Sequence, residues 1–152
     1  MGKICCIIGE EIVPNRIPLS VQLQLHKELL RAITEGFTVF LSGFGNVPEL
    51  FFADLVFELR KIHPRLFLEA ALPYRSAIRN PHPDFKRLIY QCNGISIHNT
   101  RHTNSSLLIR NRQIIAQSKR IFVAYHSQEM KDNILALCRE SNKMKDTILF
   151  NL

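Results

Sequence analysis

The sequence predicts a single open α/β domain with a mainly parallel sheet of five or six strands. Short apolar runs alternate with amphipathic stretches along the whole chain, as expected for successive strand and helix units. The apolar runs are continuous and do not alternate with polar residues, which is typical of strands covered on both faces. A length of 152 residues fits one domain, and no repeat or linker interrupts it.

Strands and helices are expected to follow one another in turn. The predicted strands cover Lys3–Ile8, Phe37–Leu41, Leu66–Leu72, Gly94–His98, Ile121–Tyr125 and Thr147–Leu152. The predicted helices cover Ser20–Glu35, Val47–Ile62, Asp84–Gln91, a segment from Thr103 or Asn104 to Ser118, and Gln128–Ser141. Glu69 lies in the middle of the third strand and favours an edge position for that strand.

Composition points to a protein of the cytoplasm. The four cysteines form no CxxC pair, and Cys5 and Cys6 lie inside an apolar run, so we interpret them as reduced core thiols. No stretch approaches the ~20 apolar residues that a membrane-spanning helix needs. The segment before the first strand is too short for a signal peptide. We therefore expect a cytoplasmic protein with no membrane partner.

Positive charge is concentrated in one part of the chain. The net charge is +7, from 20 Lys and Arg against 13 Asp and Glu. No acidic residue occurs from Phe85 to Gln128, and the seven Lys and Arg of that segment equal the whole excess. A segment of one sign attracts phosphate, which makes nucleic acid a candidate partner; the alternative is a solvated helix face with no ligand.

The candidate site follows from the rule that open parallel sheets bind ligands outside the carboxyl ends of their strands. That rule selects Gly9 and Glu10 after the first strand, Pro73 and Tyr74 after the third, and Ser127 after the fifth. His98 and His102 are four residues apart in a predicted loop with no third ligand in view, so no metal site is predicted.

The turn after the second strand, Ser42-Gly43-Phe44-Gly45, is a candidate phosphate cradle. Its glycines would let a ligand touch the backbone, and the helix that begins at Val47 offers unpaired N–H groups and a positive dipole end. A tight turn in which glycine supplies a positive φ explains the same residues.

Glu49 has two interpretations. As the capping-box partner of Asn46, its carboxylate accepts the Asn46 N–H and does nothing else. As a functional carboxylate one turn into the helix, it would hold a ribose hydroxyl or attack an anomeric carbon.

The helix before the fifth strand contains a polar pair. Asn111 lies four residues from Leu107 and from Ile115, in the middle of an apolar stripe, so its amide needs hydrogen-bond partners from a loop backbone or a ligand. Arg110 lies at the edge of the stripe, where it either contacts a phosphate through its guanidinium or is an ordinary surface residue.

The order of these motifs resembles the SLOG superfamily, which includes the DNA-processing DprA proteins, the cytokinin-activating LOG enzymes and the YpsA-like proteins. The matching stretches are the first strand ending in Gly9, "LSGFG" with Glu49 before "LFFADLVFELRKIHP", "ALPY", and "RNRQIIAQSKRIFVAY". The YpsA-like branch is the most similar, with an "ELRKxxP" helix end and an "LPF/Y" turn. The resemblance covers about residues 3–141.

The resemblance implies a Rossmann-like three-layer domain over residues 1–152, with a pocket for a nucleotide or a nucleotide-derived ligand such as ADP-ribose or an NAD-like compound. The pocket would be lined by Gly9, Ser42, Gly43, Glu49, Arg110 and Asn111, and bordered by Pro73 and Tyr74. Members of the superfamily often dimerise, so a homodimer is expected.

The sequence departs from the superfamily pattern at three places. Val47 stands where many relatives have a second glycine. Glu10 follows Gly9 where relatives often have polar or basic residues. The stretch "HSQEMKDN" after the fifth strand lacks the Gly-Gly-Thr that many members use to hold phosphate.

Three functional hypotheses result, and they leave open whether the chain is an enzyme. The main one is a sensor or regulatory module that binds a nucleotide-like ligand, with no certain cofactor. The second is a hydrolase or transferase acting on the N-glycosidic bond of nucleoside monophosphates, with Glu49 as the catalytic carboxylate. The third is binding of single-stranded nucleic acid through residues 85–128, although the aromatic residues of that segment, such as Tyr90, are expected mostly in the core.

Overall fold

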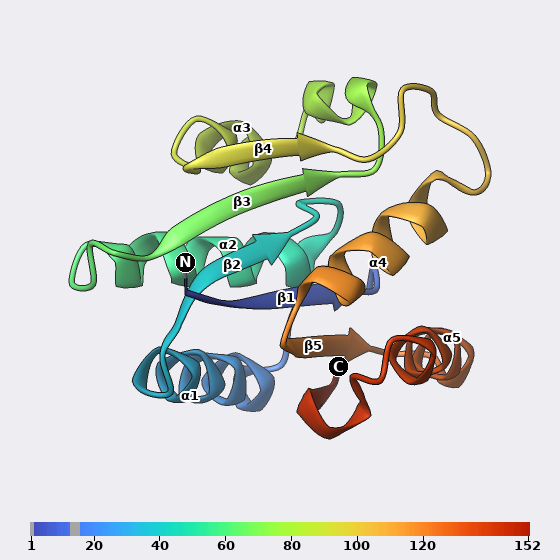
Figure 1. Ribbon diagram of the computed structural model, residues 1–152. Helices are drawn as coiled ribbons and strands as arrows, with labels where there is room; N and C mark the ends of the chain where they lie inside the picture. The colour runs from blue at the N-terminus through green and yellow to red at the C-terminus, as the bar shows by residue number, and fades with distance from the viewer. Residues whose placement is uncertain (1, 13–15) are drawn as a thin grey trace.

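Six parallel strands form one sheet between two layers of helices in the computed structural model, which describes residues 2–12 and 16–152 (Figure 1). The strands are β1 (Lys3–Gly9), β2 (Phe37–Ser42), β3 (Phe67–Leu72), β4 (Gly94–Ile97), β5 (Arg120–Tyr125) and β6 (Thr147–Asn151). The α-helices are α1 (Leu19–Thr34), α2 (Val47–Arg60), α3 (Pro83–Ile89), α4 (Ser106–Gln117) and α5 (Gln128–Glu140). Two short 3-10 helices are η1 (Arg75–Arg79) and η2 (Met144–Asp146).

The strand order is β4-β3-β2-β1-β5-β6, and every neighbouring pair is parallel. The chain runs outward from β1 to β4 and then returns to the other side of β1 to add β5 and β6. The order therefore reverses next to β1, which is where open α/β sheets place their ligands. The predicted α/β class and parallel sheet are confirmed.

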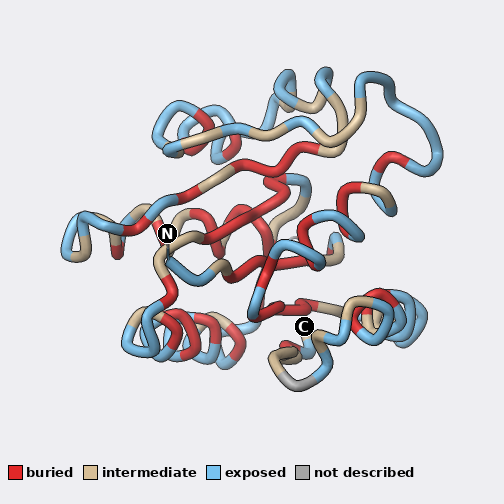
Figure 2. Tube along the Cα trace, viewed as in Figure 1, coloured by how far each residue is buried: buried red, intermediate tan, exposed pale blue. Residues whose placement is uncertain are grey.

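The helices divide into two layers according to the apolar faces that they bury. The side chains of α1, α2 and α3 share one core with residues of the sheet such as Phe40 and Phe122. The side chains of α4 and α5 share a second core on the opposite face, with Cys6, Ile8 and Leu41. The sheet is thus covered on both sides, which explains why its strands read as continuous apolar runs. Figure 2 shows the buried stretches along the inner strands of the sheet in red.

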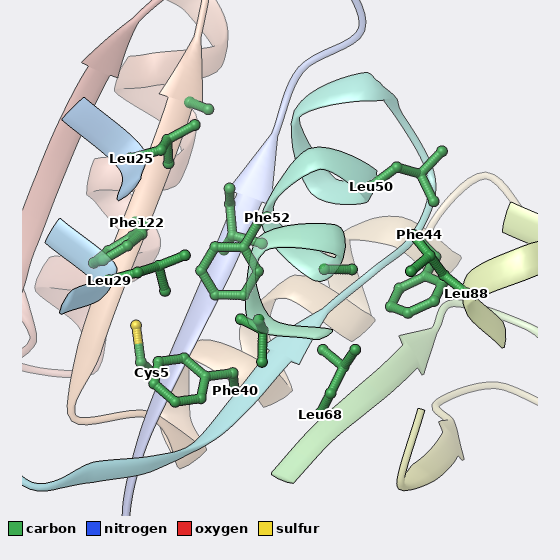
Figure 3. Packing of buried hydrophobic residues seen from close by; sticks show 14 of the residues in the cluster. Cys5, Leu25, Leu29, Phe40, Phe44, Leu50, Phe52, Leu68, Leu88 and Phe122 are labelled. Carbon is green, nitrogen blue, oxygen red and sulfur yellow. The ribbon is translucent and has the colours of Figure 1, made fainter. Parts of the chain in front are cut away.

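Aromatic rings join α2 to the middle of the sheet. The Phe52 ring lies 6.2 Å from the ring of Phe40 and 5.7 Å from that of Phe122, measured between centroids. Figure 3 shows Phe52 between these two rings, with Leu25 and Leu29 of α1 nearby. This packing fixes α2 over β1 and β2, and it thereby fixes the position of the α2 amino terminus at the strand ends.

The edge assignment of the third strand is wrong. β3 is internal, and β4 is the edge strand beyond it. Glu69 is tolerated inside the sheet because the Ser96 hydroxyl on β4 donates to Glu69 Oε2 at 2.8 Å. The helix expected from Thr103 or Asn104 begins later, at Ser106, because the residues before it form a loop. Within the described residues, no helix combines the length and the apolar character needed to cross a membrane.

Leu25 and Leu23 provide a matched test of the α1 packing. Leu25 is fully buried and Leu23 is 62% exposed on the same helix. We expect Leu25→Ala to lower the free energy of unfolding by about 3 kcal/mol, since a cavity adds to the lost apolar transfer. Leu23→Ala should change it by less than about 0.5 kcal/mol. Urea unfolding followed by circular dichroism measures both, and equal losses would contradict the assigned face of α1.

Candidate functional site

The carboxyl ends of the strands open onto one large cleft. Its volume is about 1070 Å³. It is walled by the ends of β1 and β3, the turn after β2, η1, the start of α4 and the start of α5. Figure 1 shows these segments together at the end of the sheet to which the strand arrows point. The cleft is larger than the range of about 300–1,000 Å³ that is usual for small-molecule pockets.

The structure brings the sequence-predicted residues together at this cleft, with one exception. The predicted residues that line it are Gly9, Glu10, Gly43, Phe44, Gly45, Glu49, Pro73, Tyr74, Arg110, Asn111 and Ser127. Ser42 lies beneath it, fully buried, and its hydroxyl donates to the Glu49 carbonyl oxygen at 2.7 Å. The strand-end rule therefore places these residues well, whereas their role in binding stays a prediction.

The Glu49 carboxylate joins three separate segments under the floor of the cleft. Glu49 is 1% exposed. Its Oε2 accepts the Gly9 N–H at 3.0 Å, and its Oε1 accepts the Gly45 N–H at 2.9 Å. Arg110 Nη2 lies 3.7 Å from Oε2. Because both carboxylate oxygens are occupied, the geometry favours a structural role for Glu49 over a nucleophilic one.

Only one of the two hydrogen bonds of the capping box predicted for α2 is present. Asn46 is the N-cap, and its Oδ1 accepts the Glu49 N–H at 3.1 Å as expected. The Glu49 carboxylate does not return to Asn46, because it bonds to Gly9 and Gly45 instead. Asn46 Nδ2 also reaches across to the Gly9 carbonyl oxygen at 2.8 Å. The start of α2 is thus bound to the end of β1 by side chains from both sides.

Arg110 fills the space that Gly43 leaves open. The guanidinium is 2% exposed; its Nη1 donates to the Ala71 carbonyl oxygen and its Nε donates to Asn111 Oδ1, each at 3.0 Å. A Cβ on Gly43 would overlap this guanidinium and would lie 2.7 Å from Glu49 Oε1. Glycine is therefore required for the close approach of the ion pair, and Arg110 is not the surface residue that one interpretation allowed. The Asn111 side-chain oxygen accepts a hydrogen bond from Arg110, which is neither the loop backbone nor the ligand expected from the sequence.

The turn after β2 does not use its glycines for a positive φ. Phe44 is the residue in the left-handed region, with φ 57°, and neither Gly43 nor Gly45 has a positive φ. The Phe44 ring is fully buried and meets the Phe85 ring edge-on, with 5.9 Å between centroids. Burial of the ring compensates for the strained backbone, which costs about 1–2 kcal/mol for a non-glycine residue.

Glu10 occupies the amide donors at the start of α5. Its Oε1 accepts the N–H groups of His126 and Ser127 at 2.7 and 2.8 Å, and its Oε2 accepts the Ser127 hydroxyl at 2.7 Å. Partial burial raises the pKa of Glu10, but the hydrogen bonds from Ser127 and His126 outweigh it and hold the pKa below its ordinary value. A carboxylate of the chain thus lies just before α5, where it repels a second anion.

Most of the charge in the acid-free segment is neutralised by carboxylates from elsewhere in the chain. The pairs are Arg87–Asp54 at 3.1 Å, Arg110–Glu49 at 3.7 Å, Arg112–Glu140 at 3.2 Å and Arg120–Glu35 at 2.7 Å. The one-signed field expected from residues 85–128 is accordingly weakened, because a run of charge along the sequence is not a patch in space.

Charges of opposite sign lie at different walls of the cleft. Glu10, Glu11 and Glu129 line the wall near α5, whereas Arg79 lines the wall at η1. Arg75 and Arg79 are exposed, and no ion-pair partner is found for either among the described residues. Sequence reasoning missed both, since they lie in a stretch read as a plain loop before the acid-free segment.

An aromatic pair stands at the η1 wall. The rings of Tyr74 and His102 are stacked 4.0 Å apart with 14° between their planes. The loop that carries His102 is held in place at its base, because Asn99 Nδ2 donates to the carbonyl oxygens of Pro73 and Ser106. By contrast Tyr90, which was expected in the core, is 86% exposed and precedes the amino end of β4, away from the cleft.

The buried thiols are unsuited to chemistry at the cleft. All four cysteines are free, and Cys5, Cys6 and Cys138 are buried. Burial raises the pKa of Cys6 to about 12. No cluster of three or more His, Cys, Asp or Glu with metal-binding geometry occurs among the described residues.

Comparison with known proteins gives a likeness of fold. No protein-family model matches the chain, and no curated protein matches it by sequence. The structure is similar to that of DNA processing protein A from Helicobacter pylori, solved to examine its single-stranded DNA binding mode, with a TM-score of 0.68 and 16% identity. The match covers 97% of this chain but only 64% of that protein. The likeness supports the SLOG resemblance at the level of fold; the YpsA-like branch, the dimer and the cytoplasmic location stay predictions.

The Glu49–Arg110 pair can be tested by removing its charges singly and together. We expect Glu49→Gln and Arg110→Met each to lower the free energy of unfolding by about 3 kcal/mol, because each leaves the other charge buried without its partner. The double variant should lose less than the sum of the two. Chemical denaturation measures all three, and strictly additive losses would show that the two side chains are not coupled.

Glu10 predicts a pH-dependent contribution to stability. Because its pKa is lowered in the folded protein, its contribution is present above the ordinary glutamate pKa of about 4.3 and is lost as the pH falls through the folded value. Glu10→Gln should cost about 1 kcal/mol at neutral pH, the usual net worth of a hydrogen bond, because the amide keeps only one of the two acceptor oxygens. Chemical denaturation at a series of pH values measures the loss, which should shrink on acidification; a loss that stays the same at every pH would contradict the prediction.

Proposed function

We propose that the chain binds single-stranded nucleic acid along the η1 side of the cleft. The observation that carries the proposal is the Tyr74–His102 stack, which lies at the rim of the cleft beside Arg79. Proteins that bind single strands combine aromatic faces, on which bases stack, with cations that follow the phosphates. The η1 wall offers both within one short segment of chain.

The distribution of charge supports the same side of the cleft. The guanidinium of Arg110 is paired with Glu49, and the amides at the start of α5 are occupied by Glu10. A phosphate chain is therefore repelled from the α5 wall, where Glu11 and Glu129 add negative charge. It is attracted to the η1 wall, where Arg75 and Arg79 are exposed.

The similar protein from Helicobacter pylori agrees with this proposal. Its structure was solved for its single-stranded DNA binding mode, and it shares the fold of this chain. The residues proposed to bind here follow from the geometry of this chain alone.

A nucleotide-like small ligand is the second candidate, favoured by the depth of the cleft between α4 and α5. There Leu107 and Leu108, which are 54% and 46% exposed, line the cavity with Met130 and Ile134. Such an apolar wall suits a base or ribose that leaves the solvent. Calorimetry with AMP, ADP-ribose and NAD tests it, and heat with one of these but none with oligonucleotides would favour this candidate over the first.

Strand binding is tested with a labelled oligothymidylate and fluorescence anisotropy. We expect affinity to fall as salt rises, because counterions are released from the bound phosphates. Tyr74→Ala should weaken binding about tenfold, since a stacked base contributes roughly 1–3 kcal/mol.

Tyr90→Ala is the matched control, because Tyr90 is 86% exposed and lies at the other end of β4. Its affinity should equal that of the native protein. Equal weakening by the two substitutions, or binding that ignores salt, would contradict the proposal.

A further inference from the structure

A second, smaller hollow adjoins the cleft behind the aromatic pair. Its volume is about 270 Å³. It is lined by Tyr74, Arg75, Ser76, Ile78, Arg79, Thr100 and His102. Tyr74, Ser76, Arg79 and His102 also line the cleft, so the stacked rings form part of the wall between the two spaces. The hollow is smaller than the pockets of about 300–1,000 Å³ that take whole small molecules.

The chemistry of the hollow suits an anion. Two arginines, Arg75 and Arg79, and two residues with hydroxyl groups, Ser76 and Thr100, line it, and no acidic residue does. Arginine presents its N–H donors in a fork that matches the oxygens of a phosphate, and hydroxyls add further donors. Neither arginine is paired with a carboxylate in the described part of the chain, so both charges are available.

Carboxylates of the chain already occupy two sets of backbone donors at the cleft. Glu10 accepts the N–H groups of His126 and Ser127 just before α5, and Glu49 accepts those of Gly9 and Gly45. A phosphate is therefore disfavoured at these two places, whereas the hollow is an adjoining space lined by cations and by no acid.

We infer that the hollow is a phosphate subsite, which receives one backbone phosphate of a strand whose neighbouring base stacks at the Tyr74–His102 pair. The identity of the ligand as a strand rests on the proposed function, whereas the phosphate chemistry rests on the hollow alone. The space has room for a phosphate group, and the shared wall puts the neighbouring base at the η1 side of the cleft.

Two measurements test the subsite. The first is the salt dependence of oligothymidylate binding by Arg75→Gln and Arg79→Gln, with Arg65→Gln as control, because Arg65 is exposed before the amino end of β3. Each cleft variant removes one of the two cations that face the phosphate, so each should reduce the slope of log affinity against log salt, by up to about 0.7 if the whole phosphate contact is lost, whereas the control should leave the slope unchanged. The second is NMR of the arginine Nε–H signals of the native protein during titration with thymidine monophosphate and, separately, thymidine.

Together, the two measurements distinguish the phosphate subsite from the proposed binding of a single strand. Reduced slopes, together with signals of Arg75 and Arg79 that shift with the monophosphate but not with thymidine, are the expected result. Strand binding with unchanged slopes would overturn the subsite and leave the proposed function standing. Absence of strand binding, with the two signals still shifting, would overturn the proposed function and keep the subsite. No binding and no shift would overturn both.

Discussion

The buried Glu49 carboxylate is the interaction on which the strand-end architecture depends. It accepts hydrogen bonds from the end of β1 and from the turn after β2, and it faces the guanidinium of Arg110 on α4. A carboxylate can be buried only when hydrogen bonds and an opposite charge replace its water. Three elements that are distant in sequence must therefore meet at this point, and the floor of the cleft is held rigid as a result.

The Glu10 carboxylate likewise joins two distant segments, at the wall of the cleft near α5. The acidic residue after Gly9 and the stretch after the fifth strand are in direct contact in the structure, because Glu10 accepts the N–H groups of His126 and Ser127. A carboxylate of the chain is thus the partner of these two amides. The exposed arginines without an ion-pair partner among the described residues at the cleft, Arg75 and Arg79, lie in η1.

The sequence was sufficient for the architecture and for the gathering of residues at the strand ends, since both follow from local apolar runs and a topological rule. The sequence did not predict which side chains would pair with one another. Nothing near Arg110 in the sequence indicates that it pairs with Glu49, because that contact depends on how α4 crosses the sheet. The strand-end rule placed Tyr74 at the cleft, but nothing in the sequence indicated that its ring stacks on His102, or that Tyr90, expected in the core, is 86% exposed.

The central place of β1 has a consequence for how the nascent chain folds. One side of β1 pairs with β2 soon after both strands are made, but its other side pairs with β5, so that Cys5 faces Arg120. Until β5 has been synthesised, the apolar edge around Cys6 and Ile7 has no native neighbour. An unpaired edge of this kind is a template for foreign strands. The sheet can therefore be completed around β1 only after residues 120–125 have been made.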